Sequence, residues 1–148
     1  MQYLFAVNLL GSMRSTADLD ILVEMSDENL KKLVTILLQE GYKVKQPIDP
    51  FNIVNKNTRE DWINNKNLKA LNFYKERELK EVDIIIDSPV SFEMAKDKVV
   101  LVKVDDLMLP VISIDHLIEM KKSAGRKVDV LDIEELEKVK KLRSENEI

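Results

Sequence analysis

Apolar residues recur along the chain at two spacings, which divide the sequence into helices and strands. The clearest helix is predicted over residues 27–40, where leucine and valine recur three and four positions apart. Ser26 or Asp27 can cap its start, and Gly41 can end it. Further helices are predicted near 58–64, over 91–96, from Ser113 to Lys122 and over 129–143, the last with an inward face of Leu136, Val139 and Leu142.

Strands are predicted where β-branched and apolar residues alternate or run together. They cover residues 18–23, 68–74, 81–87, 99–104 and 109–113, while residues 2–10 fit either a strand or a short buried helix. Pro47 and Pro50 break any regular element between the first two helices, which predicts a crossing loop there. Because strands and helices do not alternate strictly, we expect one α/β (α+β) domain over residues 1–148. Its mixed β-sheet would be flanked by helices that cover one side.

Composition narrows the class of protein further. With 45% hydrophobic and 34% charged residues, the 148-residue chain is expected to be globular rather than disordered. The net charge of −4 gives no reason to expect a general nucleic-acid-binding surface, although a local basic patch fits it. The absence of cysteine excludes disulfides and thiolate metal sites and agrees with a cytoplasmic location. No apolar run approaches the roughly 20 residues of a membrane helix.

Two aspartates, Asp18 and Asp20, open the first predicted strand and stand two positions apart. Side chains at that spacing share one face, roughly 7 Å apart at the backbone. Their charges repel unless a cation lies between them, and Mg²⁺ is the natural partner of such oxygens. A third acid comes from the 81–87 strand if that strand lies beside the first, with Asp83 preferred over Asp87 because it lies deeper in the apolar run. A D-x-D pair alone is more often only a polar strand end.

Four segments in fixed order resemble the DNA polymerase beta nucleotidyltransferase superfamily, and most closely its small prokaryotic members of the abortive-infection or toxin–antitoxin type. The first segment is AVNLLGSMRSTADLDILVE (residues 6–24). The others are REDWINNKNLKALNFY (59–74), EVDIIID (81–87) and ISIDHLIEMKKSAGRKVDVLDIEEL (112–136). In one departure, the family's glycine pair aligns without gaps with Tyr3 and Leu4, so we expect this sequence to lack the family's N-terminal Gly-Gly segment.

The resemblance implies an enzyme that uses Mg²⁺ (or Mn²⁺) to transfer a nucleoside monophosphate from an NTP to an acceptor hydroxyl. ATP is the expected donor, and RNA, a protein side chain or a small molecule is the expected acceptor. The metal ligands and catalytic residues would be Asp18, Asp20 and Asp83. The nucleotide would be bound by Gly11, Ser12, Arg14, Thr16, Lys121 and Arg126.

The alternative is a catalytically impaired module of the same fold that acts, like an antitoxin, through nucleotide or partner-protein binding. A missing first strand would leave an exposed sheet edge, which favours a homodimer. Some of the residues also have a purely structural interpretation. Lys121 and Arg126 belong to a basic cluster at a helix end, where cations are favourable in any case. Asp129 and Asp132 would cap the last helix or pair with Arg126, and His116 is expected to be a surface or packing residue.

Overall fold

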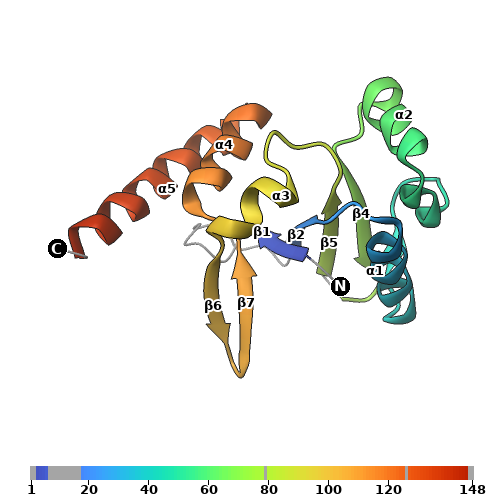
Figure 1. Cartoon of the computed structure of the whole chain (residues 1–148), viewed down its shortest axis with the longest axis horizontal. Coiled ribbons are helices and arrows are strands. Elements are labelled where there is room, and N and C mark those ends of the chain that lie inside the picture. Colours follow the sequence, from blue (N-terminus) through green and yellow to red (C-terminus); the bar gives the residue numbers. More distant parts are fainter. Residues whose placement is uncertain (1–2, 7–17, 79, 126, 147–148) are drawn as a thin grey trace.

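The computed structural model describes residues 3–6, 18–78, 80–125 and 127–146, with the side chains of all of these except 3–6, 18, 104, 128 and 143–146. Within this part of the chain, seven strands form one sheet in the order β3-β4-β5-β2-β1-β7-β6 (Figure 1). The strands are β1 (Tyr3–Ala6), β2 (Asp18–Val23), β3 (Lys43–Val44), β4 (Ala70–Lys75), β5 (Lys80–Ile85), β6 (Val100–Val104) and β7 (Leu107–Val111).

The sheet is mixed. Strand β2 runs parallel to β5, and β1 runs parallel to β7, whereas all other neighbours are antiparallel. The predicted α+β class with a mixed sheet flanked by helices is therefore confirmed. Tyr3–Ala6 form strand β1, so this part of the N-terminal apolar segment is a strand and not a short helix. Strand β3 was not predicted, because two residues are too few to show a period.

Helices cover both faces of the sheet (Figure 1). One layer contains α1 (Asp27–Gln39), the 3₁₀ turn η1 (Pro50–Val54) and α2 (Lys56–Lys66). The other contains α3 (Phe92–Ala95), followed by the 3₁₀ turn η2 (Lys96–Lys98), together with α4 (Ile114–Ala124) and α5 (Lys127–Asn146). No helix among the described residues combines the length and the apolar character of a bilayer-spanning segment.

The expectation that helices cover only one side is wrong, and β2 shows why. Ile21 and Val23 pack into the core cluster under α1, whereas Leu22 between them packs into the cluster under α4. A strand that is apolar on both faces needs cover on both faces. The inward face predicted for the last helix is also only partly correct. Leu136 is 2% exposed, but Leu142 is 59% exposed because the end of α5 extends past the sheet (Figure 1).

Local signals account for the element boundaries. Ser26 caps α1, since its hydroxyl oxygen accepts the backbone N–H of Asn29 at 3.3 Å. Gly125 ends α4 with a φ of +65°, a conformation that glycine adopts at little cost. Arg59 fastens η1 to α2, because its Nη1 donates to the carbonyl oxygens of Ile53 at 2.5 Å and Val54 at 3.0 Å. Burial lowers the pKa of this guanidinium.

Candidate active site

Asp20 and Asp83 lie side by side on neighbouring strands inside the sheet. The parallel register of β2 and β5 pairs Asp20 with Asp83 and Asp18 with Glu81. Neighbouring strands are about 4.8 Å apart and paired residues point to the same face, so the two carboxylates can reach one shared ligand. Asp18 belongs to this face by its position two residues before Asp20, but its side chain lies outside the described ones.

Asp87, the alternative third acid, lies elsewhere. It follows the end of β5, and its Oδ2 accepts a hydrogen bond from Lys69 Nζ at 2.7 Å. A three-aspartate site requires the strand of Asp83 to lie beside the strand of Asp18 and Asp20, and the pairing of β5 with β2 meets this requirement. The structure thus brings Asp83, and not Asp87, next to Asp20.

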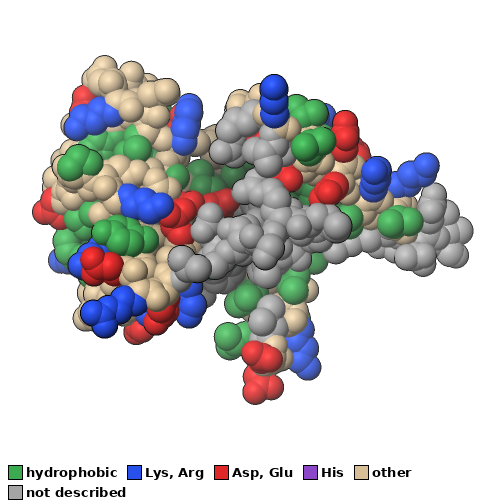
Figure 2. Space-filling view, turned by 180° about the vertical axis from the view of Figure 1, so that it is seen from behind, with side chains coloured by type: hydrophobic (Ala, Val, Ile, Leu, Met, Phe, Trp, Pro, Cys, Tyr) green, Lys and Arg blue, Asp and Glu red, His purple; other side chains and the backbone are tan. Residues whose placement is uncertain are grey.

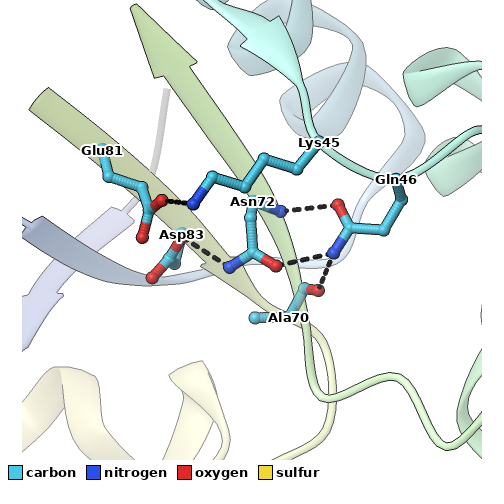
Figure 3. A network of polar contacts seen from close by, with 6 residues as sticks. All are labelled: Lys45, Gln46, Ala70, Asn72, Glu81 and Asp83. Atoms are coloured by element: carbon cyan, nitrogen blue, oxygen red, sulfur yellow. Dashed lines mark hydrogen bonds and ion pairs between the residues drawn. The ribbon is translucent and has the colours of Figure 1, made fainter. Parts of the chain in front are cut away.

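A network of side-chain amides holds one oxygen of Asp83 in place (Figure 3). Asn72, which pairs with Asp83 across β4 and β5, donates from Nδ2 to Asp83 Oδ1 at 2.6 Å. Gln46 Nε2 donates to Asn72 Oδ1 at 2.6 Å, and the backbone N–H of Asn72 donates to Gln46 Oε1 at 3.0 Å. Because Gln46 binds the oxygen of the Asn72 amide, the NH₂ group must face Asp83. One carboxylate oxygen is therefore fixed, and the other can accept a further ligand.

Glu81, the fourth acid of this face, is paired with a cation. Its carboxylate forms an ion pair with Lys45 Nζ, and its side chain is only 20% exposed (Figure 3). Lys45 and Gln46 are consecutive residues, so one short segment after β3 supplies a partner to Glu81 and orients the amide that binds Asp83. The charge of Glu81 is therefore balanced by a lysine.

The apolar core begins one row beyond the aspartates. Leu22, two positions after Asp20, is 3% exposed, and Ile85, two positions after Asp83, packs against the same core cluster. Asp20 and Asp83 are themselves half-buried. Charges at the border of an apolar core are screened less by water and salt than charges on an open surface, which strengthens their attraction for a cation.

The donor set at this position fits a hard divalent cation. Mg²⁺ is commonly held by one or two carboxylates and completes its shell with water and phosphate oxygens. Asp20 and Asp83 provide two carboxylates, and Asp18 would add a third. Among the described side chains no group of three acids or histidines forms a metal cage, and the Asp18 side chain is not among them.

Lys121, predicted to bind the nucleotide, lies in a buried ion cluster between α4 and α5. Its Nζ is 2.9 Å from Asp132 Oδ2 and 3.7 Å from Asp129 Oδ1. The side chains of Lys121, Asp132 and Asp129 are 11%, 6% and 1% exposed. This lysine thus has two carboxylates as partners and little surface for a phosphate. The other predicted nucleotide-binding residues, Gly11, Ser12, Arg14, Thr16 and Arg126, lie outside the described residues.

Two further features of the described residues are a cleft and the histidine at position 116. A cleft of about 610 Å³ lies between the end of β5 and α4, lined by Lys69, Asp87, Ser88, Pro89, Met120, Ser123 and Ala124. Its lining includes Asp87, the alternative third acid, but neither Asp20 nor Asp83. His116 is half-buried, and its Nδ1 is enclosed without a hydrogen-bond partner among the described residues, as suits a packing residue.

Sequence reasoning missed Asn72, Gln46 and the Lys45–Glu81 pair. A signal for two of them was present. Glu81 and Asp83 form an E-x-D pair that repeats the spacing of Asp18 and Asp20, and Asn72 is a polar residue between the buried Leu71 and Phe73. Nothing in the spacing of Lys45 and Gln46 links them to residues 26 or more positions away.

Comparison with known proteins supports the fold. No family model and no curated protein matches the sequence. Among solved structures, the chain is similar to the lincosamide antibiotic adenylyltransferase LnuA, whose crystal structure contains lincomycin. The TM-score is 0.58 at 16% sequence identity, and the match covers 93% of this chain and 86% of that chain. This likeness shows that the chain has the fold of a nucleotidyltransferase.

Proposed function

We propose that this protein is a Mg²⁺-dependent nucleotidyltransferase that transfers a nucleoside monophosphate, with ATP as donor, to an acceptor hydroxyl. The observation that carries the proposal is the register of Asp20 and Asp83, which places two carboxylates together on the sheet of a nucleotidyltransferase fold. The orientation of Asp83 by Asn72 supports it, because a binding site needs side chains that are held in place.

In the proposed reaction the acceptor hydroxyl releases its proton to solvent and its oxygen forms a bond to the α-phosphorus. The bond from that phosphorus to the β-phosphate oxygen breaks, which releases pyrophosphate. Asp18, Asp20 and Asp83 would hold the cation. When bound, the cation neutralises phosphate charge and lowers the pKa of the acceptor hydroxyl. Asn72 keeps one Asp83 oxygen engaged, so the carboxylate cannot rotate away from its position. The protein then contributes mainly positioning and charge.

The residues before Asp18 complete the proposal. Gly11, Ser12, Arg14 and Thr16 precede the aspartates directly, so in this reaction they would contact the triphosphate, with the arginine able to bind two phosphate oxygens at once. Arg126 would add further positive charge. The solved neighbour is named for transfer to a lincosamide, which makes a small hydroxylated molecule the first acceptor class to test, before RNA and protein.

The direct test uses ATP labelled at the α-phosphate, purified protein and a panel of hydroxylated small molecules that includes a lincosamide. We expect label to move to an acceptor in the presence of Mg²⁺ or Mn²⁺ and not in the presence of EDTA. Calorimetric titration with ATP and Mg²⁺ is run in parallel. Nucleotide binding without transfer to any small molecule, RNA or protein would favour the impaired module, and the absence of binding would contradict the proposal.

Asn72 provides a prediction for the network. We expect Asn72→Ala to lower the rate of transfer by about 10- to 100-fold, the usual effect of losing a group that orients a metal ligand. The apparent affinity for Mn²⁺ should fall with it, as measured by electron paramagnetic resonance. Asn65→Ala is the matched control, since this asparagine is exposed on α2 and bonds Asp61 outside the sheet. Equal activity and metal affinity of Asn72→Ala and the parent protein would exclude this role.

A further inference from the structure

The hairpin β6–β7 extends away from the body of the molecule (Figure 1). Strand β6 is the last strand of the sheet, and within the described residues it pairs with β7 alone. Its other side therefore presents unpaired backbone N–H and C=O groups, which are a template for pairing with another strand. The edge expected at the N-terminal strand is absent by contrast, because β1 pairs with both β2 and β7.

The hairpin exposes apolar side chains along its length. Leu101 is 61% exposed, Leu107 64% and Met108 55%, and apolar, basic and acidic side chains follow one another along the projection (Figure 2). The hairpin is anchored up to its middle, where the paired Val102 and Leu109 pack against the core cluster under α4. Two strands alone are marginally stable in water, so such a projection gains stability when a further strand covers it.

Besides the exposed Asp97 and Lys103, charges of opposite sign stand at the two ends of β6. Lys98 stands two positions before the strand, and Asp105 and Asp106 form the two-residue turn that follows it. All three side chains are exposed, and none has an ion-pair partner within the described residues. An antiparallel copy of the same strand would bring the acidic end of one against the basic end of the other, whereas a parallel copy would oppose like charges.

We propose that the outer edge of β6 is a dimerisation surface that pairs antiparallel with β6 of a second copy, about a two-fold axis at Val102. This register pairs all five residues of the strand and places Lys98 of each copy opposite Asp106 of the other. In a two-fold interface every contact occurs twice, so the dimer would contain two such ion pairs. The two sheets would join into one. The proposal is independent of the proposed function.

Reversing the charges at Lys98 and Asp106 tests this arrangement, because only an interface that pairs these two residues should respond to both changes. Sedimentation equilibrium of the full chain should show a monomer–dimer equilibrium. Lys98→Glu and Asp106→Lys should each raise the dissociation constant by about tenfold, because each replaces two attractive pairs by two repulsive ones. An equimolar mixture of the two variants should dimerise as well as the parent protein, since both pairs are then attractive again.

The controls separate folding from assembly. Lys56→Glu changes an exposed charge on α2 and should leave the dimer unchanged, and circular dichroism should confirm that every variant is folded. Because the chain has no cysteine, Lys103→Cys adds a single thiol. Two such thiols would lie roughly 8 Å apart in the dimer, so a short bis-maleimide should cross-link the two copies. The same reagent should not cross-link the control variant Lys56→Cys. A monomer at all concentrations, or a dimer unaffected by both charge changes, would overturn the proposal.

Discussion

Replacing either Asp20 or Asp83 by asparagine is expected to lower Mg²⁺-dependent nucleotidyl transfer by about a thousandfold or more. A metal ligand of this kind contributes several kcal/mol to stabilising the charge of the transition state, and each 1.36 kcal/mol corresponds to about tenfold in rate. Asparagine keeps the size of the side chain and removes its charge, so the sheet should remain folded. The rate is measured with ATP labelled at the α-phosphate, with the amount of folded protein checked by circular dichroism.

Asp87→Asn is the matched control for this prediction. Asp87 has the same chemistry as Asp83 and lies four positions further along the same segment, but it pairs with Lys69 outside the sheet. Losing an exposed ion pair of this kind costs about 0–1 kcal/mol of stability and should leave the rate within a fewfold of the parent protein. Mn²⁺ affinity, followed by electron paramagnetic resonance, should fall in Asp20→Asn and Asp83→Asn and persist in Asp87→Asn. A reversed order would identify Asp87 as the third ligand.

Replacing Lys121 by methionine is expected to lower the free energy of unfolding by about 3 kcal/mol or more. The substitution removes the ammonium group between Asp129 and Asp132, whose side chains are 1% and 6% exposed, and leaves buried negative charge behind. In a chain of this size the Tm should fall by about 10 °C. Urea unfolding followed by circular dichroism gives the free energy, and calorimetry gives the Tm.

Lys122→Met is the control, because this neighbouring lysine is exposed and should change stability by no more than about 0.5 kcal/mol. The double variant Lys121→Met, Asp132→Asn should recover part of the loss, since it removes the negative charge of one buried carboxylate together with the lysine. If Lys121 instead binds phosphate, Lys121→Met should retain its stability and lose nucleotide affinity. The stability and binding measurements together therefore distinguish its two interpretations.

The sequence predicted most of the elements because their local signals are strong. Strand β2 begins at Asp18 and ends at Val23 as expected, and α1 begins at Asp27 after the Ser26 cap. The errors occur where length or context decides. Two residues of β3 carry no period, and the exposure of Leu142 depends on where the sheet ends rather than on helical spacing.

The sequence indicates which acidic residues belong to the candidate site, but it does not indicate which side chains contact them. Asp18, Asp20 and Asp83 stand out because carboxylates interrupt apolar strands. Asp83 was preferred over Asp87 because it lies deeper in the apolar run, but its place next to Asp20 depends on β5 lying beside β2, which is a property of the sheet. The surroundings of Lys121 could not be predicted, since a basic residue near a helix end gives no local sign that a second helix will supply two carboxylates.

The sequence by itself therefore determined the α+β class, the strands that carry the aspartates and the possibility of a shared cation, because these follow from spacing along one segment. Only the tertiary structure decided which residues meet. It paired Asp20 with Asp83 and gave Asp83 the amide of Asn72, which Gln46 orients. It also enclosed Lys121 between two helices and, within the described part of the chain, left β6 paired on one side only. Contacts between distant segments are set by the order and packing of strands and helices, which no local pattern contains.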